Sequence, residues 1–150
     1  MHLLPISLRT QTNRPECLAV CAAMVLDYHQ LSFRYATVLR QLDVGVGGAP
    51  FRNLVNLSSR RIDATVHEGA IVDLRFWLSQ SIPPIVFVAT KELPYWTIET
   101  FHAVVIIGMD DENVYLADPA FNTSPQIAPI GDFDLAWFEM GESYGLIRPK

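Results

Sequence analysis

The sequence predicts an α+β fold, in which helices dominate the first half of the chain and an antiparallel sheet dominates the second. Between residues 17 and 42, apolar residues recur at three- and four-residue spacing, which is the period of a helix. After residue 64, apolar residues instead form short runs rich in Val and Ile that end at Gly, Pro or Asp, as strands do. Helices first and strands afterwards is the order of an α+β arrangement.

Composition predicts one soluble domain spanning residues 1–150. Half of the residues are hydrophobic and 18% are charged, which is typical of a globular protein rather than a disordered one. The net charge of −5 argues against a nucleic-acid partner, because such a partner needs a basic face. The longest uncharged runs, residues 79–90 and 100–109, are about half of the roughly 20 residues that a membrane-spanning helix needs. No signal-peptide pattern opens the chain, so we expect a cytoplasmic protein.

The remaining elements follow from local patterns. In the first half, residues 3–8 are expected to form a short strand, and residues 34–42 and 50–57 to form helices separated by glycines. In the second half, helices are expected at 72–79 and 132–140, and strands at 64–67, 85–89, 101–107, 114–117 and 143–147.

Residues 11–30 carry the strongest pattern, because a polar loop leads into an apolar helix with a cysteine at the junction. Pro15 and Glu16 suit the first turn of a helix. Cys17 is therefore expected in that turn, where unpaired backbone N–H groups favour the nucleophilic thiolate. One helix face is predicted to collect Cys17, Val20, Cys21, Met24, Val25 and Tyr28.

Cys17 and Cys21 are expected to be reduced, because two cysteines four residues apart on one helix are badly placed for a disulfide. A metal site built from both cysteines and a histidine would lack the paired CxxC spacing, so no metal or other cofactor is predicted. Cys21 is expected to pack in the core. Cys17, taken alone, could equally be a small buried apolar residue.

The two strands at residues 101–107 and 114–117 predict a base for the thiol. If their turn centres on Asp110, His102 stands directly opposite Asp118, within reach of an imidazole–carboxylate hydrogen bond. A histidine oriented by an aspartate is the base half of a nucleophilic triad. Taken singly, His102 could be an ordinary sheet histidine, and Asp118 before Pro119 could start a turn.

The order of Cys17, His102 and Asp118 along the chain matches that of papain-like cysteine proteases. With further motifs, the chain resembles the bacteriocin-processing, double-glycine leader peptidases (cysteine peptidase family thirty-nine) and their stand-alone relatives over nearly its whole length. The motifs are Q-T-N-R-P-E-C-L-A-V-C-A-A-M-V-L-D-Y-H (11–29), F-H-A-V-V-I-I-G-M-D (101–110), V-Y-L-A-D-P-A-F (114–121) and F-D-L-A-W-F-E-M-G (133–141).

This resemblance implies a papain-like fold and a thiol-dependent peptidase that needs no cofactor. Cys17 would be the nucleophile, His102 the general base and acid, and Asp118 the group that orients the imidazole. Gln11 and the Cys17 backbone N–H would form the oxyanion hole. The implied substrate is a peptide or protein, as in leader-peptide or precursor processing.

Leu18 departs from the family pattern, which has glycine directly after the nucleophile. A side chain there can narrow the site, so a weakly active or inactive peptide-binding module is an alternative. An acyl or amide transferase using the same triad is another. Leu18, Tyr95 and Trp96 are candidate substrate-binding residues, although Tyr95 and Trp96 could equally cap the core.

Overall fold

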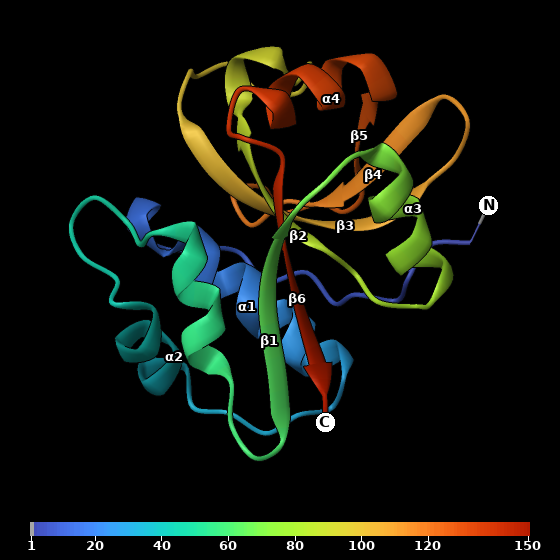
Figure 1. Ribbon diagram of the computed structural model, residues 1–150. Coiled ribbons are helices and arrows are strands. Elements are labelled where there is room, and N and C mark those ends of the chain that lie inside the picture. Colours follow the sequence, from blue (N-terminus) through green and yellow to red (C-terminus); the bar gives the residue numbers. More distant parts are fainter. Residues whose placement is uncertain (1) are drawn as a thin grey trace.

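A computed structural model describes residues 2–150 and is built around one antiparallel sheet with the strand order β1-β6-β2-β3-β4-β5 (Figure 1). Every neighbouring pair in this order is antiparallel. The strands are β1 (Ile62–Glu68), β2 (Ile85–Ala89), β3 (Phe101–Met109), β4 (Asn113–Ala117), β5 (Gln126–Pro129) and β6 (Ser143–Pro149).

Helices cover both faces of this sheet (Figure 1). The first face carries α1 (Cys17–Tyr28), α2 (Tyr35–Leu42) and the 3₁₀ helix η2 (Phe51–Leu57). The second face carries α3 (Ile71–Ser79) and α4 (Ile130–Phe138). Two further 3₁₀ turns are η1 (Arg14–Glu16), directly before α1, and η3 (Thr90–Glu92), after β2. The mixed helix-and-sheet class expected from the sequence is confirmed, with helices on the second face as well as the first.

Strand β3 divides its side chains between two separate cores. Ala103 and Val105 face the core that contains α1, whereas Val104 and Ile106 face the core that contains α4. This alternation is the two-residue period of a strand. A strand with both faces covered reads as a continuous apolar run, which is what residues 103–107 show.

Helix α1 is buried on every side, which differs from the one-sided apolar face that the spacing predicts. All ten residues from Cys17 to Leu26 are buried. The sheet covers one side of the helix, and α2 and the N-terminal segment with Leu4 cover others. A helix that is hydrophobic all round is a central core helix.

One predicted element is wrong, one is a 3₁₀ helix, and one strand was not predicted. Residues 3–8 form no strand, because Pro5 lacks an N–H and Ile6 N–H donates back to Leu4 O at 2.8 Å; only Leu4 N–H reaches the sheet, at Ile107 O. The helix expected at residues 50–57 is present as the 3₁₀ helix η2. Strand β5 was not predicted, because its four residues are too short to show a period.

The predicted hairpin register is also wrong, but His102 and Asp118 are still neighbours, as that register predicts. Val105 pairs with Ala117, so the same register continued by one residue puts Asp118 opposite Val104 rather than His102. The turn closes later than expected, with Asp110 N–H donating to Asn113 O at 3.0 Å, and a β-bulge follows Ile106. A displacement of two residues keeps both side chains on one face, so His102 and Asp118 are diagonal neighbours.

Gly145 in β6 allows the sheet to approach η2 closely. A Cβ added there would collide with Leu54 Cδ1, and Leu54 is fully buried. We expect Gly145→Ala to lower the free energy of unfolding by about 1–3 kcal/mol through overpacking. Gly131→Ala is the control, because nothing lies within 4 Å of its added Cβ. Urea denaturation of both variants measures the difference, and equal stability would contradict this packing.

Candidate active site

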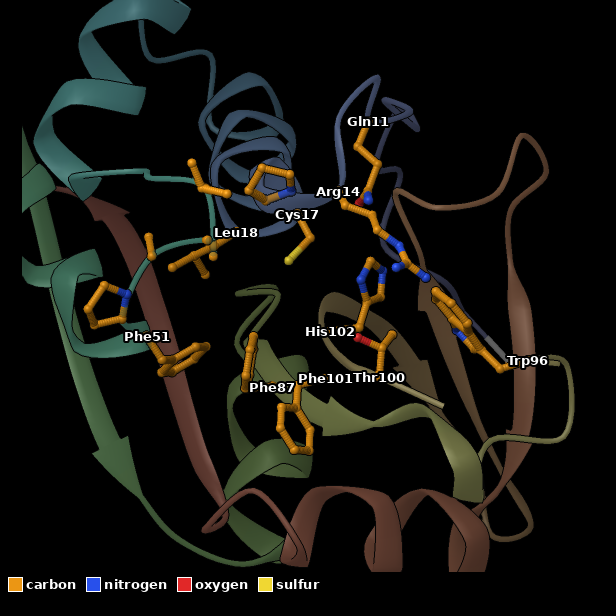
Figure 2. Close-up of a pocket in the computed structure, with 16 residues that line it drawn as sticks. Gln11, Arg14, Cys17, Leu18, Phe51, Phe87, Trp96, Thr100, Phe101 and His102 are labelled. Carbon is orange, nitrogen blue, oxygen red and sulfur yellow. The ribbon is translucent and has the colours of Figure 1, made fainter. Parts of the chain in front are cut away.

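The three residues of the predicted triad come together from three different parts of the fold. Cys17 is the first residue of α1, His102 lies near the start of β3, and Asp118 directly follows β4. His102 Nε2 lies 2.7 Å from Asp118 Oδ1. Cys17 and His102 both line one cleft, and Figure 2 shows their side chains as neighbours in it.

The cleft has a volume of about 730 Å³ and two walls of different character. One wall is apolar and includes Leu18, Phe51 and Phe87, together with the loop of residues 46–50. The other wall includes Gln11, Arg14, Trp96 and Thr100 (Figure 2). Cys17 and His102 lie between the two walls.

The Asp118 carboxylate is completely buried and accepts four hydrogen bonds. Oδ1 accepts from His102 Nε2 and from the backbone N–H of Ala120 at 2.9 Å. Oδ2 accepts from Tyr95 Oη at 2.8 Å and from Trp96 Nε1 at 3.0 Å. A buried carboxylate is tolerated when its lone pairs are occupied in this way.

These contacts raise the pKa of His102 and lower the pKa of Asp118. Burial by itself lowers the pKa of His102, but the hydrogen bond and charge of Asp118 and the interaction with the Cys17 side chain raise that pKa to about 9. Burial by itself raises the pKa of Asp118, but the hydrogen bond and charge of His102 and the donors Ala120 and Tyr95 hold that pKa below its ordinary value. The pair is therefore an imidazolium and a carboxylate near neutral pH.

The two cysteines have different surroundings. Cys17 is 9% exposed and lines the cleft, whereas Cys21, one turn further along α1, is 0% exposed and lies in the core. Burial, together with the charges of Cys17 and Asp118, raises the pKa of the Cys21 thiol well above its ordinary value. Only Cys17 is placed to react with a molecule in the cleft.

Gln11 is tied to the same group of residues through its backbone. Its N–H donates to Pro119 O at 2.8 Å, one residue after Asp118. Its side chain reaches into the cleft above the Cys17–His102 pair (Figure 2). The side-chain Oε1 is buried and has no hydrogen-bond partner within residues 2–150.

Tyr95, Trp96 and Leu18 have distinct places. Tyr95 and Trp96 both donate to Asp118, and the Trp96 ring also packs edge-on against His102, with ring centroids 4.9 Å apart. Trp96 and Leu18 line the cleft, and Leu18 is 1% exposed because its side chain also packs in the core. The link from Tyr95 to Asp118 was not foreseen, because residues 93–100 show no periodicity that places them in space.

Two components of the cleft were missed in the sequence. Arg14 and the loop of residues 46–50 line it, but neither carries a motif beyond its closeness to Cys17 or its glycines. Among residues 2–150, no group of three or more His, Cys, Asp or Glu side chains is arranged to hold a metal ion. Nor does that part of the chain contain a helix with the length and apolarity needed to cross a membrane.

Known proteins share this fold over almost the whole chain. A C39-like peptidase described from Bacillus anthracis superimposes with a TM-score of 0.77 and 19% identity, covering 99% of this chain and 98% of the other. A double-glycine motif protease from an AMS/PCAT transporter, solved with the leader peptide, gives 0.75 and 20%, covering 99% and 94%. The peptidase domain of Streptococcus ComA, a bifunctional ABC transporter of a quorum-sensing pathway, gives 0.76 and 15%, covering 97% and 99%.

At these identities the structural likeness demonstrates the fold alone, and no curated protein sequence matches the chain. The sequence model of the peptidase C39 family, however, matches residues 6–140. That match covers most of the chain, and the chain therefore belongs to the peptidase C39 family.

Proposed function

We propose that this protein is a cysteine peptidase that hydrolyses peptide bonds with Cys17, His102 and Asp118 as its catalytic triad. The observation that carries the proposal is the buried His102–Asp118 pair, with His102 Nε2 2.7 Å from Asp118 Oδ1 and His102 lining one cleft together with Cys17, the first residue of α1. Membership of a peptidase family supports the same reaction class. A thiol, an imidazole and an orienting carboxylate are the parts that nucleophilic acyl transfer needs.

The first half-reaction forms a thioester. The Cys17 thiolate attacks the carbonyl carbon of the peptide bond, and the negative charge moves to the carbonyl oxygen. The Gln11 side-chain amide and the Cys17 backbone N–H donate hydrogen bonds to that oxyanion. His102 Nε2 is held by Asp118, so Nδ1 carries the proton that passes to the leaving amine as the C–N bond breaks.

The second half-reaction hydrolyses the thioester. Neutral His102 removes a proton from a water molecule, and the resulting hydroxide adds to the thioester carbonyl. The tetrahedral intermediate collapses, the C–S bond breaks, and the carboxylic acid product leaves. Cys17 departs as a thiolate beside a protonated His102, which is the starting state.

We propose a peptide as substrate, of the kind removed in precursor processing. The cleft is open to solvent, and residues line it on both sides of Cys17. A similar fold has been solved with a leader peptide bound. Leu18 shares its wall with Phe51 and leaves the cleft open, so its presence after the nucleophile gives no support to a module that binds without cleaving.

Alkylation tests the nucleophile directly. We expect iodoacetamide near pH 7 to label Cys17 rapidly and Cys21 hardly at all, because Cys21 is fully buried with a raised thiol pKa. Cys17→Ala should therefore abolish rapid labelling and peptide cleavage, while Cys21→Ala keeps both. Mass spectrometry of tryptic peptides reads the site. Equal labelling of the two cysteines would contradict the assignment.

The pH dependence tests the His102–Asp118 pair. We expect kcat/KM to fall as pH rises through about 9, because His102 then loses the proton needed for the leaving amine. Asp118→Asn should move this limb to lower pH, because the carboxylate is a main cause of the raised pKa. A limb that stays in place in the variant would count against the pair.

The same proton affects folding. Because the pKa of His102 is higher in the folded state than its ordinary 6.5, its stabilising contribution is complete below about pH 6.5 and is lost as pH rises to about 9. We expect the free energy of unfolding to decrease over this range, and to decrease less in Asp118→Asn. Urea titrations at several pH values measure both slopes.

Tyr95→Phe tests whether Tyr95 positions the carboxylate or binds substrate. Removing one hydrogen bond to a charged group, worth about 1.5–3 kcal/mol, should lower kcat by roughly tenfold or more and leave KM nearly unchanged. Tyr28→Phe is the matched control. Tyr28 Oη donates a hydrogen bond of 2.8 Å to Ser81 O, and neither residue lines the cleft. A rise in KM at constant kcat would instead assign Tyr95 to substrate binding.

A further inference from the structure

The guanidinium of Arg14 is a positive charge at the cleft that no acidic side chain neutralises. Arg14 lies in η1, three residues before Cys17, and its side chain is exposed. None of the ion pairs formed within residues 2–150 involves it. The nearest acid in sequence is already occupied, because Glu16 accepts hydrogen bonds from Tyr35 Oη at 2.8 Å and from Asn13 Nδ2 at 2.6 Å.

Arg14 is also the only arginine, lysine or carboxylate among the residues that line the cleft. Figure 2 shows its side chain extending past His102 toward Trp96, while Phe51 and Phe87 lie on the opposite side of Cys17. The cleft is therefore apolar on one side of the thiol and positively charged on the other.

The side of the scissile bond that Arg14 faces follows from the proton transfer. His102 must reach the leaving amine to protonate it, so substrate residues that follow the scissile bond lie on the His102 side of Cys17. Trp96, which packs against His102, and Arg14 are both on that side. Arg14 thus faces the leaving segment of the substrate.

We propose that Arg14 binds a carboxylate in the leaving segment of the substrate, so that the enzyme selects substrates with a negative charge after the scissile bond. This inference rests on the proposed peptidase function. A guanidinium matches a carboxylate with two parallel N–H donors, which gives geometric selectivity as well as attraction. The carboxylate can be the side chain of Asp or Glu, or the free C-terminus of a short leaving segment.

The first test uses two reagents that differ only in the group that Arg14 would recognise. Iodoacetate and iodoacetamide both alkylate Cys17 with loss of iodide, but only iodoacetate carries a carboxylate. We expect Arg14→Gln to slow iodoacetate by roughly three- to tenfold at low salt and to change the iodoacetamide rate by less than about twofold. Arg14→Lys should keep part of the preference.

Arg40→Gln is the matched control, because Arg40 is an exposed arginine on α2 that does not line the cleft. It should leave both alkylation rates unchanged. Equal rate changes for the two reagents in Arg14→Gln, or no change in either, would overturn the proposal.

The second test distinguishes the source of the carboxylate by peptide cleavage. Quenched fluorescent peptides with Gly-Gly before the scissile bond would carry Asp or Asn after it, each with a C-terminal acid or amide. If the ratio of kcat/KM for the Asp peptide to that for the Asn peptide falls in Arg14→Gln, Arg14 binds a side-chain carboxylate. If instead the ratio for the C-terminal acid to the C-terminal amide falls, Arg14 binds the free C-terminus. If neither ratio changes in Arg14→Gln, the proposal fails.

The two tests also separate this inference from the proposed function. If the wild-type protein cleaves no peptide but its iodoacetate preference depends on Arg14, peptidase activity is contradicted and the carboxylate site stands. If peptides are cleaved but charge selection is the same in Arg14→Gln, the peptidase stands and the carboxylate site is overturned.

Discussion

The buried carboxylate of Asp118 is the constraint on which the rest of the site depends. An ionised carboxylate without partners inside a protein costs several kcal/mol, so its donors must be present for the fold to be stable. Those donors come from β3, through His102, from the loop after β2, through Tyr95 and Trp96, and from Ala120. The hydrogen bonds that satisfy this one buried charge thus fix both His102 and the Trp96 side of the cleft.

The sheet supplies the rigid support for this arrangement. Because helices cover both faces, β3 is buried on each side and holds the start of the strand, with His102, in one position. Helix α1 is enclosed on every side, so its first residue is presented at a fixed point of the cleft. Cys17 and His102 therefore come from two rigid elements, and the Gln11 backbone is fixed through its hydrogen bond to Pro119 O.

The site places positive charge close to the groups that become negative in the proposed reaction. The His102–Asp118 pair keeps a proton on the imidazole up to about pH 9, and Arg14 adds a second positive charge to the polar wall. A thiolate and a developing oxyanion are both negative, so positive charge nearby favours each of them. Cys21, by contrast, lies in an apolar core that raises the pKa of its thiol, so it is not suited to act as a thiolate nucleophile.

Sequence patterns alone predict the helix that begins at Cys17 and most of the strands, because period, turn residues and local motifs are properties of neighbours along the chain. They fail at the hairpin register, since the bulge after Ile106 and the later turn depend on pairing. The hydrogen bonds from Tyr95 and Trp96 to Asp118, and the position of Arg14 at the cleft, become visible in the folded structure alone. Those contacts join segments without periodicity, and they form only when the buried charge and the two cores have fixed where each segment lies.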